Sequence, residues 1–211
     1  MTDEDTRVND EIKEVTLTLH NAINCDEMFK RCRTLNYVDL TLPHATTCND
    51  MFFACTNILT VKLNAPQASS FGGTFVANGN LKSVEVSLHK AIDCSAMFTG
   101  CTSLTDVNLD LPNATICEDM FVLCMGLVSI DLSLPRATDC DTMFDGCSNL
   151  TSVTLNLPQL DSYIDMFKEC SALESIDVTI PISIVNDFKT YVESLELENL
   201  TSFKINGEEQ L

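Results

Sequence analysis

Apolar residues recur along this chain with a fixed period of 23 residues. Seven phenylalanines mark the repeat without an insertion or a deletion: Phe29, Phe52, Phe75, Phe98, Phe121, Phe144 and Phe167. A period in the twenties is typical of solenoids, in which each repeat stacks on its neighbours. One copy buries too little apolar surface to offset the entropy of ordering its backbone, so the array is predicted to fold as a unit.

Each copy also holds a short stretch in which apolar and polar residues alternate. Val38, Leu40 and Leu42 are separated by single polar residues, which predicts a strand with one buried face. A proline ends this stretch in six copies, since it has no amide hydrogen for strand pairing: Pro43, Pro66, Pro112, Pro135, Pro158 and Pro181. The Met-Phe segment would return the chain as a short helical, 3₁₀ or irregular piece. The sequence therefore predicts an α/β repeat solenoid with a parallel sheet along one side.

The regular pattern covers residues 12–180 and changes at both ends. Residues 1–11 are polar and acidic and offer no apolar cap. Residues 181–211 break the period. There, the apolar spacing around Phe188 predicts an amphipathic helix, and the spacing around Phe203 repeats the strand pattern, so this segment is expected to be a helix–strand cap. An uncapped first coil would expose apolar side chains, which makes self-association through the N-terminal coil an expectation.

Two local motifs resemble those of a known family. The pattern L-x-x-V-x-L, seen in "LTDVNL" and "LTSVTL", resembles a leucine-rich repeat. The longer stretches "MFTGCTSLTDV" and "MFDGCSNLTSV" are similar to the BspA-like, or Treponema-type, class of 23-residue repeats. The resemblance covers about residues 12 to 180 and implies a leucine-rich-repeat fold, a protein partner and no catalytic residue. Members of this class are commonly cell-surface proteins.

Charge and composition narrow the function. The chain has 31 acidic and 12 basic residues and a formal charge of −19, which repels phosphate backbones, so direct nucleic-acid binding is not expected. No apolar run reaches the roughly 20 residues of a membrane-spanning helix. The start, "MTDEDTRVNDEIKE", lacks the pattern of an export signal. As it stands, the sequence predicts a cytoplasmic protein, and a cell-surface or secreted protein is the alternative if a signal has been removed.

The eleven cysteines occupy two columns of the repeat, one before the Met-Phe pair and one after it. Phe71 and Tyr163 replace cysteine in the first column, and Asn78 replaces it in the second. Aromatic replacements indicate an inward-facing position, so the favoured interpretation is a set of buried thiols that pack as small hydrophobic side chains. Inter-coil disulfides and a zinc site are the alternatives. An odd number of cysteines weighs against the first, and the absence of C-x-x-C weighs against the second.

No arrangement of residues predicts catalysis. The three histidines, His20, His44 and His89, lie at predicted strand ends and are interpreted as surface loop residues. The methionine before each phenylalanine is better explained by core packing than by copper binding. Neither a nucleophile motif nor a phosphate-binding glycine loop is present in the sequence. We therefore expect a protein that is not an enzyme and that needs no cofactor or metal.

Two surfaces are candidates for partner binding. The first is the set of larger side chains that point outward from the predicted sheet: Tyr37, Asp39, Lys62, Glu85, Asp106, Asp110, Asp131 and Asp177. Most of these are acidic, which predicts a basic protein partner. The second lies at the copy "NAPQASSFGGTFVANGN", which departs from the repeat and would present a second set if the coil is bent there: Phe53, Phe71 and Asn78.

The leading functional hypothesis is a non-enzymatic protein–protein interaction module, with bacterial surface adhesion as its more specific form. One alternative is an acidic intracellular inhibitor, of phage or viral type, that mimics nucleic acid and blocks a basic protein. A second alternative is a structural spacer or oligomerisation piece.

Overall fold

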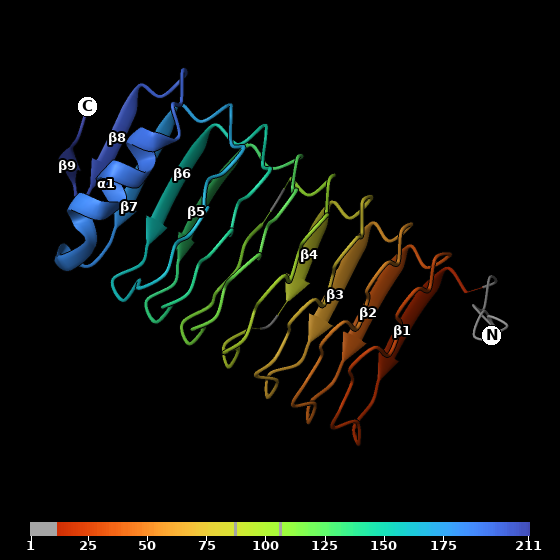
Figure 1. The fold of residues 1–211 in the computed structure, drawn as a ribbon. Helices are drawn as coiled ribbons and strands as arrows, with labels where there is room; N and C mark the ends of the chain where they lie inside the picture. The colour runs from red at the N-terminus through yellow and green to blue at the C-terminus, as the bar shows by residue number, and fades with distance from the viewer. Residues whose placement is uncertain (1–11, 87, 106) are drawn as a thin grey trace, which may run out of the picture.

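The computed structural model describes residues 12–86, 88–105 and 107–211. The chain winds into coils that stack along one axis from the N-terminus to the C-terminus, with the strands along one side (Figure 1). This confirms the predicted parallel-strand solenoid. The strands are β1 (Glu14–Thr18), β2 (Tyr37–Thr41), β3 (Thr60–Asn64), β4 (Ser83–Val86), β5 (Ser129–Ser133), β6 (Ser152–Asn156), β7 (Ser175–Thr179), β8 (Ser202–Ile205) and β9 (Glu208–Glu209).

The register of the sheet follows the repeat. Strands β1 to β4 pair in parallel with one another, as do β5 to β7, and equivalent residues stand side by side, as in Val38 beside Val61 and Leu40 beside Leu63. Because side chains alternate between the two faces of a strand, this register stacks apolar columns inside the coil and polar columns outside it. The predicted alternation is confirmed in β2, where Val38 and Leu40 are buried between partly exposed neighbours.

The strands form two sheets, with the order β1-β2-β3-β4 in one and β5-β6-β7-β8-β9 in the other. The strand expected around Val107 is not formed in residues 107–110, and Val107 and Leu109 are only partly buried. The solenoid is nevertheless continuous, because a second line of parallel bridges on the return side runs from Asn24 through every coil to Ser162.

The return segments are irregular rather than helical. Their amide groups alternate between two kinds of partner. The Phe29 amide donates to the Met51 carbonyl of the next coil at 2.8 Å, whereas the Lys30 amide donates to the Glu27 carbonyl of its own coil at 3.0 Å. This alternation places two residues of each copy in the left-handed region, such as Asp50 at a φ of 52° in the second copy. A right-handed helix cannot contain such residues, so the helical alternatives for this segment are not adopted.

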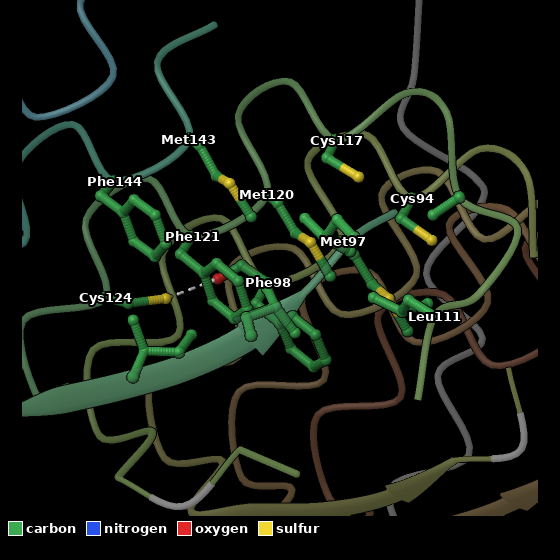
Figure 2. Close-up of a cluster of buried hydrophobic side chains, with 14 of the residues drawn as sticks. Cys94, Met97, Phe98, Leu111, Cys117, Met120, Phe121, Cys124, Met143 and Phe144 are labelled. Atoms are coloured by element: carbon green, nitrogen blue, oxygen red, sulfur yellow. Dashed lines mark hydrogen bonds between the residues drawn. The ribbon is translucent and has the colours of Figure 1, made fainter. Parts of the chain in front are cut away.

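The core is a set of stacked ladders, one for each repeat column. The seven predicted phenylalanines stack from coil to coil, with ring centroids 5.3 Å apart at the closest pair, Phe75 and Phe98, and 5.8 Å apart at the widest, Phe144 and Phe167. Figure 2 shows the Met97, Met120 and Met143 side chains running beside this phenylalanine ladder. All three methionines are fully buried, which confirms their packing role.

A helix and a hairpin close the C-terminal end. A 3₁₀ turn, η1 (Ile182–Ile184), leads into α1 (Val185–Ser194), which buries Phe188 and Val192. The chain then adds β8 in parallel to β7 and folds back as the short antiparallel strand β9. The predicted helix–strand cap is therefore present, and Figure 1 shows α1 lying over the last coils.

Candidate partner-binding surfaces

Five thiols of the second cysteine column donate hydrogen bonds to carbonyl groups of the preceding coil. Cys124 donates to the Phe98 carbonyl at 3.2 Å, as drawn in Figure 2. The same bond, from a thiol to the phenylalanine carbonyl 26 residues earlier, is made by Cys55, Cys101, Cys147 and Cys170. The interpretation of this column as purely hydrophobic was therefore incomplete, because the thiols also satisfy buried carbonyl groups.

The buried thiols of Cys55 and Cys147 are unsuited to nucleophilic chemistry. All eleven cysteines are free. Burial raises the pKa of the Cys55 and Cys147 thiols to about 12, so these groups stay protonated at neutral pH. The thiolate is the reactive form, and a protonated buried thiol is inert. Among the residues that the structure describes, no group of three or more His, Cys, Asp or Glu side chains could hold a metal ion.

The deviant copy is explained by the same hydrogen bond. Asn78 stands in the second cysteine column, and its Nδ2 donates to the Phe52 carbonyl at 3.0 Å, as a thiol does elsewhere. The Thr74 hydroxyl, in the methionine column, shares its hydrogen between the Phe71 and Cys48 carbonyls, whose oxygens lie 2.6 and 2.9 Å away. Phe71 and Asn78 are both 0% exposed. This copy is therefore not bent open, and neither side chain has a surface to offer a partner.

Phe53, the third residue of that predicted set, is different. Its ring is partly exposed on the return side of the coil, and the Lys30 ammonium lies 5.1 Å from the ring centroid. Lys30 also pairs with Glu27 at 2.7 Å and with Asp50 at 3.3 Å. Phe53 is thus covered in part by a cation from the preceding coil, a contact that the repeat pattern alone does not reveal.

The predicted sheet-face residues lie on one side of the solenoid and point out of the core. Glu85, Asp110 and Asp131 are exposed, and Tyr37, Asp39, Lys62 and Asp177 are partly exposed. An ion pair between Lys62 and Glu85, at 3.0 Å, connects neighbouring coils on this face, and His89 Nε2 lies 3.0 Å from the Asp110 carboxylate. Asp106 lies outside the described residues. The face is therefore a row of polar side chains carried by the strands and by the segment that follows Asp106.

A second acidic surface lies on the return side and was not predicted from the sequence. It consists of Glu118 and the aspartates around it. Burial and the neighbouring carboxylates of Asp139, Asp119, Asp93 and Asp141 raise the pKa of Glu118. The signal was visible in the motifs "CDEM", "CNDM", "CEDM" and "CDTM", which place a polar residue directly after the first cysteine.

Three of these polar residues have a structural role, because each accepts the amide hydrogen of the equivalent residue in the next coil. Asp26 accepts from Asn49 at 2.8 Å, Asn49 accepts from Gly72 at 2.9 Å, and Asp141 accepts from Ile164 at 2.7 Å. They form a partial side-chain ladder along this edge. The acidic character of the return side is thus partly explained by the need to satisfy backbone amides.

The surface of the described residues offers shallow hollows. One, of about 270 Å³, lies between the last return turn and the loop after α1, and its lining includes Glu169, Ser171, Glu196 and Glu198. Another, of about 610 Å³, is lined at the end of the sheet by Ile182, Glu208 and neighbouring residues. Both contain carboxylates, and both lie at the C-terminal end.

In the described part of the chain, no helix has the length and apolar content needed to cross a membrane.

Comparison with known proteins agrees with this architecture. The family model described as "BspA type Leucine rich repeat region" matches residues 8–96 and 73–192 in six copies. A leucine-rich repeat protein from Bacteroides ovatus has a similar structure, with a TM-score of 0.60 and 20% sequence identity. The similarity covers 93% of this chain and 58% of that protein, so this chain spans little more than half of its structural neighbour. A search of curated proteins finds no match.

Proposed function

The chain belongs to the BspA-type leucine-rich-repeat family, and we propose that it binds a basic protein partner on the exposed face of its parallel sheet. The family and the fold are in general non-enzymatic scaffolds for protein interaction. The observation that carries the proposal is the strand alternation, which buries every second side chain and leaves columns of polar side chains on a rigid support.

The charge of this face favours a basic partner. Asp39, Glu85, Asp110, Asp131 and Asp177 project from it, whereas Lys62 is the basic residue of the predicted set and is already paired with Glu85. Acidic side chains on one face raise the encounter rate with a positively charged partner and disfavour acidic ones. The nucleic-acid-mimicking inhibitor requires such a basic partner, whereas the cell-surface adhesion role requires only a protein partner.

The proposal is tested with peptides selected on the wild-type protein from a displayed library of random sequences. The double variant Glu85→Lys/Asp131→Lys reverses two exposed charges on the sheet face. The matched control, Glu118→Lys/Asp161→Lys, makes the same change in net charge at exposed positions on the return side. We expect the selected peptides to be basic and to lose about tenfold or more in affinity for the sheet-face variant, with the control retaining binding.

Two results would contradict the proposal. Equal loss for both variants would mean that net charge alone attracts the peptides. Unchanged binding to the sheet-face variant would place the docking site elsewhere. Measuring the selected peptides at low and high salt then separates the two specific forms, since a mimic of nucleic acid should bind through charge and lose affinity steeply, whereas recognition through packed contacts should persist.

A further inference from the structure

The two halves of the solenoid differ sharply in charge. Residues 12–92 contain seven basic and six acidic side chains, whereas residues 93–211 contain four basic and twenty acidic side chains. The two ends of the solenoid show the same difference. Lys13, Arg31 and Arg33 are exposed in the first coil, and the cap carries a series of exposed glutamates. Within residues 12–211 the charge is therefore uneven along the long axis, and residues 1–11 add five acidic side chains and one basic side chain to the sequence before it.

The N-terminal end leaves core positions open. Leu17 is 46% exposed, although Leu40 and Leu63, the equivalent residues of the next two coils, are 1% and 2% exposed. Ile12, in the leucine column, is 44% exposed. Within the described residues, β1 pairs only with β2, so its outer edge has no strand partner. In the described part of the chain, this end combines exposed apolar side chains and an unpaired strand edge with nearby basic residues.

The C-terminal end presents complementary chemistry in the same columns of the repeat. Glu169 is the residue of the last full coil that corresponds to Arg31 of the first, and Ser171 corresponds to Arg33. Glu169 and Ser171 line the 270 Å³ hollow, together with Glu196 and other residues of the loop after α1. Two solenoids stacked on one axis would therefore bring the basic side chains of one over the acidic hollow of the other.

We propose that the chain associates with itself head to tail, so that the open N-terminal coil of one copy packs on the C-terminal cap of the next. Arg31 and Arg33 reach the carboxylates of Glu169, Glu196 and Glu198, while Ile12 and Leu17 lose contact with water. Charge decides the orientation. A head-to-head contact would juxtapose basic coils and a tail-to-tail contact would juxtapose acidic caps, and both would cost free energy. A head-to-tail contact is heterologous and generates chains or closed rings of copies.

Sedimentation velocity over a wide range of protein concentration tests the proposal. Arg31→Glu/Arg33→Glu reverses the head, and Glu196→Lys/Glu198→Lys reverses the tail. We expect the mean mass of the wild type to rise with concentration, and each variant alone to lose about tenfold or more in association constant. An equimolar mixture of the two variants should recover association, because the reversed head of one complements the reversed tail of the other. Salt dependence is a poorer test, since salt also screens the repulsion between two acidic molecules.

Matched controls isolate the interface. Lys82→Glu/Arg136→Glu changes the net charge as the head variant does, at exposed positions away from both ends, and should associate like the wild type. Glu118→Lys/Asp131→Lys, at two exposed positions of interior coils, serves the same purpose for the tail variant. The altered side chains are all exposed, so thermal unfolding should show that each variant folds.

Several outcomes would overturn the proposal. A wild type that stays monomeric at every concentration removes it, and so does a variant mixture that fails to associate. If the tail variant forms the same closed dimer as the wild type while the head variant does not, the contact is head to head. If the full chain is monomeric and only a chain lacking residues 1–11 associates, that segment occupies the N-terminal end instead of a second copy.

Discussion

The two ends of the solenoid are built from the same repeat, yet they finish in different ways. At the C-terminal end, the Phe167 amide donates to the Tyr191 hydroxyl at 2.7 Å, and the Ile180 amide donates to Asn206 Oδ1 at 3.0 Å. Side chains thus take the place of the carbonyls that a further coil would supply. At the N-terminal end, Leu17 remains about half exposed.

This difference shows that one copy of the repeat is only half of a folding unit. The interior coils have a neighbour on both sides, and most of their core residues reach full burial through that contact, with Val107 and Leu109 among the exceptions. In the C-terminal cap, Phe188 is 0% exposed, and its ring centroid lies 5.0 Å from that of Tyr163. Tyr163 stands at a cysteine position in the last copy of the repeat. The aromatic substitution in that column is therefore an adaptation to the cap.

The largest effect on stability is expected from truncating Phe188, the buried aromatic side chain of the C-terminal cap. Phe188→Ala should lower the free energy of unfolding by about 3–5 kcal/mol, because it leaves a cavity between α1 and the last coil. Leu17→Ala, at the open end, should cost less than about 1 kcal/mol, since its side chain is already half exposed. Urea unfolding followed by circular dichroism measures both. Similar losses at the two positions would mean that the N-terminal end is also closed in solution.

A smaller effect is expected from removing the Tyr191 hydroxyl, which accepts an amide hydrogen of the last return segment. Tyr191→Phe removes the acceptor of the Phe167 amide and should cost about 1–3 kcal/mol, the penalty for leaving a buried donor unsatisfied. Tyr37→Phe, on the exposed sheet face, is the matched control and should change stability little. Hydrogen exchange of the Phe167 amide provides a local readout, and unchanged protection in Tyr191→Phe would refute this role.

The smallest expected effect is a difference between the two ends in how strongly their cysteines make the free energy of unfolding depend on pH. Burial raises the pKa of Cys170, near the closed end, well above its ordinary value of 9.0. The folded state then keeps the proton that the unfolded state releases, so this contribution to stability is present below pH 9 and is lost as the pH rises. Cys170→Ser should reduce the loss of unfolding free energy between pH 8 and pH 10 by about 1.4 kcal/mol.

Cys32 supplies the comparison at the open end. Burial also raises the pKa of its thiol, but the side chain is only partly buried, so Cys32→Ser should change the slope of stability against pH by less. Serine keeps a donor for the Phe144 carbonyl in the Cys170 variant. Urea titrations at several pH values give the slopes, and equal slopes for both variants would contradict the difference between the ends.

Much of the fold could be predicted from the sequence because the repeat is exact. Phe29 to Phe167 share one spacing, and equal spacing forces equivalent residues into stacked columns. Alternation then assigned Val38 and Leu40 to the core.

The partner-binding surface was less predictable. Outward positions could be named, but the pairing of Lys62 with Glu85 and the burial of Asn78 depend on contacts between coils.

The sequence by itself determined the period, the strands, the inward columns and the family, since these follow from the spacing of apolar residues and from the alternating direction of side chains along a strand. Only the tertiary structure decided how the return segments satisfy their backbone groups. The acceptor of the Cys124 thiol lies 26 residues earlier in the chain, and the left-handed backbone at Asp50 accompanies alternating bonds within and between coils. Such bonds join groups that come together only once neighbouring coils are stacked, so no local pattern could specify them.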